Sequence, residues 1–258
     1  MSEANVIAQP VDDTKGKKQV IEIKNLKKSF GSQEVLRDVS LQLFNGENLV
    51  VLGKSGSGKS VLIKCIVGLL TPGGGSIEVL GEDVGALNSK ELDEMRKKIG
   101  FLFQSGALYD SMTVKENLEF PLRRVKRDLT QKEIDEKVKE VLENVGLADA
   151  IDKMPSQLSG GMRKRISLVR TIVVDPLIML YDEPTTGLDP VTSDEISLLI
   201  NSIQKTYKTS SIIITHDIEC SRMTANRVIM LKDGEVYKEG KLAEFEHSSD
   251  SLIKSFFK

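Results

Sequence analysis

The chain has little of several residue types. Its 258 residues contain no tryptophan, two cysteines and two histidines. Cys65 and Cys220 give neither a disulfide framework nor a metal-ligand spacing, and a reducing, cytoplasmic compartment fits. No run approaches the ~18 apolar residues of a membrane-spanning helix. The N-terminus carries Glu3, Asp12 and Asp13 without an apolar stretch, which argues against a secretory signal.

The charge of the chain argues against one further class, the nucleic-acid-binding proteins. The formal net charge is -2, so the chain lacks the basic excess of a nucleic-acid-binding protein, and we expect no nucleic-acid partner. Its apolar and charged fractions are ordinary for a globular domain. The length allows one large domain or a core with an inserted subdomain.

A glycine-rich loop is the clearest chemical feature. Residues 53–60 match the P-loop pattern G-x-x-x-x-G-K-S, between an apolar run at 49–52 and a helical run. Backbone N–H groups of such a loop surround phosphate oxygens, and the following helix directs its positive end at the same anion. The lysine contacts the β- and γ-phosphates, and the serine contacts Mg²⁺. We expect phosphate contacts from Gly53, Ser55, Gly56, Ser57, Gly58, Lys59 and Ser60.

Two carboxylates follow a second apolar run at residues 177–181. Such a run predicts a strand buried on both faces, whose carboxyl end lies where α/β sheets bind ligands. We expect Asp182 to hold Mg²⁺ together with Ser60. We expect Glu183 to act as the general base on the attacking water.

Residues 158–162 read Leu-Ser-Gly-Gly-Met, and here the chain resembles the ATP-binding cassette (ABC) family, whose signature is L-S-G-G-Q. The methionine is a minor departure. The resemblance implies hydrolysis of ATP to ADP and phosphate with Mg²⁺. It also implies a homodimer in which Ser159, Gly160 and Gly161 contact the γ-phosphate held by the other subunit.

Four further positions match the family pattern. Gln104 resembles the glutamine that senses Mg²⁺ and water, and Asp189 resembles the aspartate at the dimer seam. His216 resembles the histidine that bridges the γ-phosphate and the attacking water, although a lone histidine after a strand is more often structural. Phe30 resembles the aromatic platform under adenine, with packing in the core as the alternative.

The expected fold is α/β, a P-loop NTPase core of the ABC type. It combines a mostly parallel sheet that has helices on both faces with an antiparallel β layer and an inserted helical subdomain. Capping-box patterns at Thr113 and Thr130 predict helices in the insert. We expect a disordered tail at 1–18, the ATPase domain at 19–240 with its helical subdomain at about 105–172, and a C-terminal tail or helix at 241–258.

Five segments match a pattern more specific than that of the family, at residues 103–111, 116–117, 120–122, 158–165 and 181–190. They resemble the ATPase of the Mla system (maintenance of lipid asymmetry), of the MCE-associated type. That resemblance implies a permease, a periplasmic MCE lipid-binding protein and room for a STAS-domain subunit. It also implies phospholipid transport between inner and outer membranes, with this chain peripheral at the cytoplasmic face of the inner membrane.

Two alternatives remain. The chain could be the ATPase of another importer, for amino acids or metal ions, or a soluble ABC protein acting on ribosomes or DNA.

The basic run 123–127 is expected to be a solvated loop, with anionic lipid contact as the alternative. The apolar positions at 252, 253, 256 and 257 are expected to pack on the chain's own core, with docking on a partner as the alternative.

Overall fold

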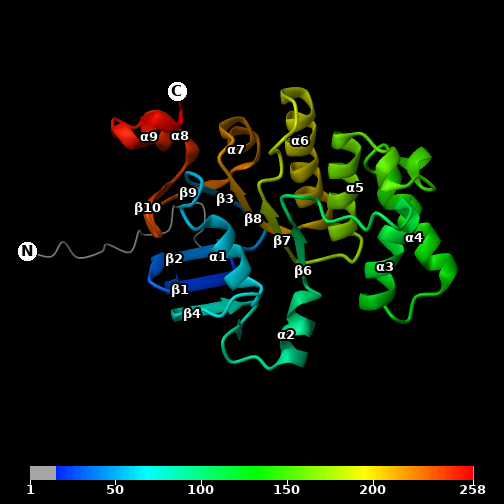
Figure 1. Cartoon of the computed structure of the whole chain (residues 1–258), viewed down its shortest axis with the longest axis horizontal. Coiled ribbons are helices and arrows are strands. Elements are labelled where there is room, and N and C mark those ends of the chain that lie inside the picture. The colour runs from blue at the N-terminus through cyan, green and yellow to red at the C-terminus, as the bar shows by residue number, and fades with distance from the viewer. Residues whose placement is uncertain (1–15, 258) are drawn as a thin grey trace, which may run out of the picture.

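The computed structural model describes residues 16–257, and a ten-stranded mixed sheet forms its centre (Figure 1). The spatial order of the strands is β5-β4-β1-β2-β10-β9-β3-β8-β7-β6. Strands β9, β3, β8, β7 and β6 pair in parallel, which confirms the predicted α/β core. The strands are β1 (Gln19–Phe30), β2 (Gln33–Phe44), β3 (Asn48–Leu52), β4 (Gly74–Val79), β5 (Glu82–Asp83), β6 (Ile99–Leu102), β7 (Ile178–Asp182), β8 (Ser210–Thr215), β9 (Arg227–Lys232) and β10 (Glu235–Gly240).

Helices lie on both sides of this sheet and in a separate group at one end (Figure 1). Helices α1 and α2 pack on one face, and α5 to α9 contribute to the core on the other. The helices are α1 (Lys59–Ile66), α2 (Ser89–Arg96), α3 (Val114–Val125), α4 (Gln131–Glu143), α5 (Gly160–Ile172), α6 (Pro190–Tyr207), α7 (Ile218–Thr224), α8 (Leu242–Glu246) and α9 (Ser251–Phe256).

Strand β3 shows why the apolar runs are continuous. All of its residues are buried. Leu49 and Val51 belong to the hydrophobic core on one face, and Val50 and Leu52 belong to the core on the other. Successive side chains of a strand point to opposite faces, so a strand covered on both sides needs an apolar residue at every position.

The antiparallel layer predicted from alternating residues is present as β1, β2 and β4. It joins the parallel core through one bridge, between Glu235 of β10 and Asp38 of β2. The predicted hairpin is also present, because β9 and β10 pair antiparallel. Its turn places Asp233 at φ 50° and Gly234 at φ 78°, as a type I′ turn requires.

The insert contains α3, α4 and α5, packed around their own hydrophobic cluster. Both predicted capping boxes form, at Thr113 and Thr130. The expectation of a solvated loop at 123–127 was wrong at its start, since α3 continues to Val125. The boundaries of the subdomain stay a prediction.

The sequence made one prediction for each end of the chain. Most of the tail predicted at residues 1–18 lies outside the described residues. At the other end, α9 packs on the core, with Ile253 fully buried and Leu252, Phe256 and Phe257 partly buried against it. The expected packing of these apolar positions on the chain's own core is therefore confirmed. Cys65 and Cys220 are buried free thiols.

Arg227 of β9 ties the two sheet regions together. It is 3% exposed, and its guanidinium donates to both carboxylate oxygens of Glu47, at 2.7 and 2.9 Å. It also donates to the carboxylate of Glu239 and to the carbonyl of Gln42 in β2. The network thus connects β2, β9, β10 and the turn before β3.

We expect Arg227→Met to lower the free energy of unfolding by about 3–5 kcal/mol, because the buried carboxylate of Glu47 and the partly buried one of Glu239 lose their counter-charge. Urea denaturation followed by circular dichroism measures the change. The matched control is Arg222→Met, since Arg222 pairs with Glu219 and Glu246 at the surface, where ion pairs contribute little. Equal stability of the two variants would refute the structural role of the buried network.

Candidate active site

The glycine loop connects β3 to α1, as the sequence predicts. Gly58 caps α1 with φ 99°, a conformation that L side chains rarely adopt. A Cβ at this position would also lie 2.6 Å from Leu36 Cδ2 and 2.9 Å from the carbonyl oxygen of Val35. Glycine is therefore required for the loop to turn into the helix beside β2.

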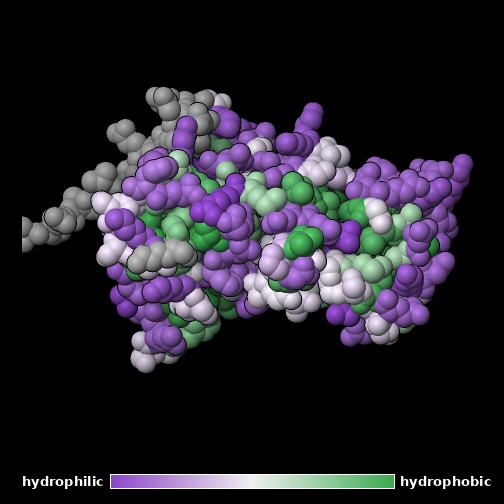
Figure 2. All heavy atoms as spheres, turned by 90° about the horizontal axis from the view of Figure 1, so that it is seen from above, coloured by the Kyte–Doolittle hydropathy of each residue, from purple (hydrophilic) through white to green (hydrophobic). Residues whose placement is uncertain are grey.

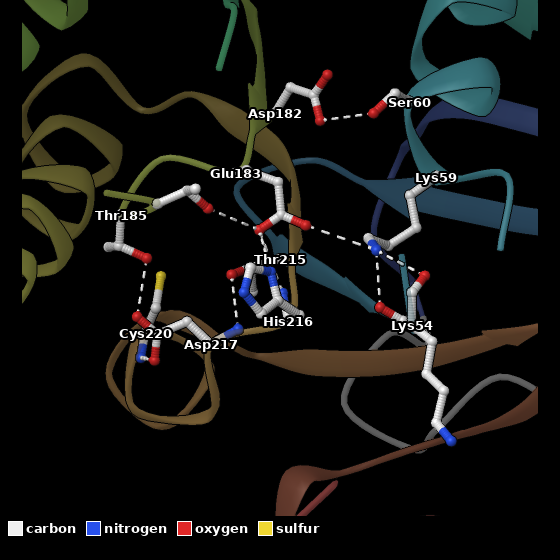
Figure 3. A network of polar contacts seen from close by, with 12 residues as sticks. Lys54, Lys59, Ser60, Asp182, Glu183, Thr185, Thr215, His216, Asp217 and Cys220 are labelled. Carbon is white, nitrogen blue, oxygen red and sulfur yellow. Dashed lines mark hydrogen bonds and ion pairs between the residues drawn. The ribbon is translucent and has the colours of Figure 1, made fainter. Parts of the chain in front are cut away.

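Lys59, at the first turn of α1, is almost fully buried. Its ammonium donates to the carbonyl oxygens of Gly53 at 2.7 Å and Lys54 at 3.2 Å. It also lies 3.5 Å from Glu183 Oε1. The ammonium therefore lies between the backbone of the glycine loop and the carboxylate of Glu183, as Figure 3 shows.

Ser60 and Asp182 meet although they are far apart in the sequence. Ser60 Oγ donates to Asp182 Oδ1 at 3.0 Å. Burial raises the pKa of the Asp182 carboxyl, and the hydroxyl bond opposes this effect. In the described residues no cluster of three or more His, Cys, Asp or Glu side chains could hold a metal by itself. A hydroxyl and one carboxylate fit Mg²⁺, which keeps waters and takes further oxygens from phosphates.

Glu183 follows β7 in a strained conformation. Its φ is 51°, which is uncommon for a residue with a Cβ. Its backbone N–H donates to the carbonyl oxygen of Ile214 in β8 at 2.8 Å. Its Oε2 lies 2.8 Å from His216 Nδ1 and accepts a bond from Thr186 Oγ1 at 3.3 Å. Strain of this kind clusters at functional sites.

His216 sits between β8 and α7 and is exposed. The next residue, Asp217, caps α7 by accepting from the Cys220 N–H. Its other oxygen accepts from Thr185 Oγ1 at 2.8 Å, so the segment is tied to the chain just after Glu183. These bonds bring the imidazole to the carboxylate of Glu183 (Figure 3).

A cavity of about 710 Å³ is lined by half of the predicted site residues. Predicted residues in its wall are Ser55, Gly56, Gly58, Lys59, Ser60, Gln104, Glu183 and His216. Phe30 is not part of the wall; it is 47% exposed with Lys28 Nζ 5.2 Å from its ring centroid, so the core-packing alternative is wrong. Its role as an adenine platform stays a prediction.

The signature residues and Asp189 also lie outside this wall. Ser159 caps α5, its Oγ accepting from the Met162 N–H at 3.2 Å. Asp189 caps α6, accepting from the N–H and hydroxyl of Thr192. Ser159, Gly160 and Asp189 are exposed. Within one chain, they do not meet the residues around Lys59.

Sequence reasoning missed several contributors, among them Lys164, Ser255 and Phe256. Lys164, beside the signature, is buried and contacts the backbone of the site. Ser255 and Phe256 of α9 line the cavity from the other end of the chain. Lys164 lay inside a quoted motif and Phe256 in the apolar C-terminal face, but neither pattern indicates proximity to a nucleotide.

Comparison with known proteins agrees with this geometry. The family described as ABC transporter matches residues 36–186. The probable ribonucleotide transport ATP-binding protein mkl of Mycobacterium leprae is 41% identical over 236 residues, covering 92% of this chain and 68% of the relative. The chloroplastic protein TRIGALACTOSYLDIACYLGLYCEROL 3 of Arabidopsis thaliana is 35% identical over 254 residues, covering 92% and 73%.

This chain is similar to a solved structure over nearly the whole length of that structure. The dimeric ATP-binding cassette MJ0796, in a post-hydrolysis state with ADP and phosphate, superimposes with a TM-score of 0.79. It is 34% identical and covers 86% of this chain and 98% of that one. The fold, the phosphate loop and these matches show a protein that binds and hydrolyses ATP. The chain belongs to the ATP-binding subunits of the ABC transporter family.

Proposed function

We propose that the cavity binds ATP with Mg²⁺ and that each predicted residue has a distinct role. Lys59 contacts the β- and γ-phosphates, and Ser60 and Asp182 hold Mg²⁺ with Gln104 nearby. When bound, the ion neutralises charge on the phosphates. Glu183 takes the proton of the attacking water, and His216 orients that water. The contact of 2.8 Å between Glu183 Oε2 and His216 Nδ1 at the cavity wall is the observation that carries these roles.

We propose that two copies close over two nucleotides. The exposed Ser159 and Gly160 of one copy, with the partly buried Gly161, then complete the cavity of the other, and Asp189 lies at the seam. The dimeric relative supports this arrangement. Figure 2 shows one face of a single copy, on which hydrophobic patches alternate with hydrophilic ones.

The loop between β6 and α3 is the proposed docking site for a permease. Phe103 and Tyr109 of this loop and Phe120 of the adjoining helix α3 are exposed, and the rings of Tyr109 and Phe120 form an edge-on pair at 5.2 Å. The buried side chain of Asn117 fixes the loop through bonds to the backbone of Tyr109 and Met112. Exposed aromatic residues on a fixed backbone are typical of protein interfaces.

We propose phospholipid as the cargo, moved through a permease and an MCE-type lipid-binding protein, with this chain at the cytoplasmic face of the inner membrane. The motif wording supports this, as does a relative named after a diacylglycerol glycolipid. The name of the mycobacterial relative points instead to ribonucleotides. Among residues 16–257, none of the helices has the length and apolar character to cross a bilayer.

The test is affinity purification of the full chain from detergent-solubilised membranes, with partners identified by mass spectrometry. We expect a multi-span permease together with an MCE protein. The control is a double variant, Tyr109→Asp with Phe120→Asp, which should lose the permease through the docking loop. Recovery of a nucleotide or amino-acid permease would replace the lipid proposal, and recovery of ribosomes or DNA-repair factors would replace the transport role.

A further inference from the structure

Lys164 is a buried cation in the middle of a charged run. It lies on α5, four residues after the N-terminal Gly160, and its side chain points inward while Arg163 is exposed. Only 6% of Lys164 is accessible. A lysine is almost never buried to this degree unless its ammonium has partners.

Its partners are two backbone carbonyls of the active site. The ammonium donates to the carbonyl oxygen of Gln104 at 3.1 Å and to that of Glu183 at 3.4 Å. In the described part of the chain, no carboxylate lies within ion-pair distance of it, although Asp182 and Glu183 are close enough to favour its charge. Burial lowers the pKa of Lys164, and these two carboxylates oppose that effect.

The bond to Glu183 acts at the strained residue. The N–H of Glu183 is held by Ile214 of β8, and its carbonyl is held by Lys164 of α5. The peptide groups on both sides of an unfavourable φ of 51° are therefore fixed by different elements. This conformation directs the side chain toward His216 and Lys59, because the Cα–Cβ bond follows the backbone.

The bond to Gln104 extends the same constraint to a second wall of the cavity. The Gln104 side chain lines the cavity, and its loop continues into the exposed aromatic residues after β6. Helix α5 itself is capped by the signature residue Ser159. One ammonium thus joins the signature helix, the loop of Gln104 and the backbone of Glu183.

We infer that Lys164 is a positioning residue for ATP hydrolysis, which sets the backbone of Glu183 and Gln104 relative to the signature helix. Lys164 makes no contact with the cavity itself and acts through these two residues. The inference rests on the proposed role of Glu183 as the general base. A purely structural lysine would stabilise the fold without changing the catalytic step.

The test compares Lys164→Met, Lys164→Arg and the surface control Lys132→Met in the full chain. We expect Lys164→Met to bind mant-ATP within about two-fold of the wild type and to lose about 30-fold in kcat, since small displacements of reacting groups reduce turnover strongly. Lys164→Arg keeps a buried donor and should recover at least about a third of the activity. Lys132→Met should leave both quantities unchanged.

A double-mutant cycle separates positioning from stability. In a Glu183→Gln background, Lys164→Met should reduce the residual rate by far less than about 30-fold, because one of the two groups through which it acts, Glu183, is already lost. A kcat of Lys164→Met close to the wild type, or a full additional loss in the Glu183→Gln background, would overturn the inference. A Glu183→Gln variant with normal turnover would instead refute the general-base role.

Thermal unfolding of each variant shows whether it folds. If Lys164→Met is unfolded, Lys164→Gln replaces it. The glutamine amide is still a hydrogen-bond donor, but it is uncharged and its side chain is shorter than that of lysine. A folded Lys164→Gln variant with wild-type kcat would also overturn the inference. One with reduced kcat and unchanged mant-ATP affinity would support it.

Discussion

Glu183→Gln is expected to abolish nearly all turnover while ATP still binds. The amide has the shape of the carboxylate but accepts no proton, and general-base catalysis contributes about 10²–10⁴-fold to a rate. The substitution also removes the charge that faces Lys59 Nζ at 3.5 Å. Phosphate release under steady-state conditions measures the loss, and size-exclusion chromatography with ATP should reveal a trapped dimer.

The control for this variant is Glu219→Gln, on α7 close to His216. Glu219 is exposed and pairs with Arg222. Its substitution should leave turnover unchanged. A Glu183→Gln variant that hydrolyses ATP within about three-fold of the wild type would remove Glu183 from the general-base role.

Ser159→Arg should also reduce turnover by about 100-fold or more, by preventing the signature residues from reaching the partner's nucleotide. The side chain is exposed and is not part of the cavity wall that contains Lys59 in its own chain, so ATP binding to the monomer should persist. Turnover is measured by phosphate release, monomer binding with mant-ATP, and dimer formation by light scattering.

Ser159 also caps α5, so the arginine removes a helix cap as well as adding bulk. Ser159→Asp is the matched control for the cap, because an aspartate retains the capping oxygen. In the proposed sandwich it also places a negative charge beside the γ-phosphate, so it too should fail in turnover while matching the wild type in thermal stability. Retained ATPase activity in Ser159→Arg would contradict the proposed sandwich.

Local features of this protein were determined by the sequence alone. The P-loop pattern, the capping boxes at Thr113 and Thr130 and the turn at Asp233 were correct, because each depends on neighbouring residues and on φ preferences. The continuous apolar run of β3 predicted burial on both faces for a similar reason, since strand side chains alternate.

Only the tertiary structure decided which distant groups meet. The sheet order places the end of β7 beside β8, which brings Glu183 to His216 across 33 residues. Sequence spacing does not say that Lys164 turns inward while Arg163 stays exposed, because burial depends on what the rest of the chain packs against that helix face. The same holds for Phe256, which reaches the nucleotide cavity only because α9 folds back onto the core.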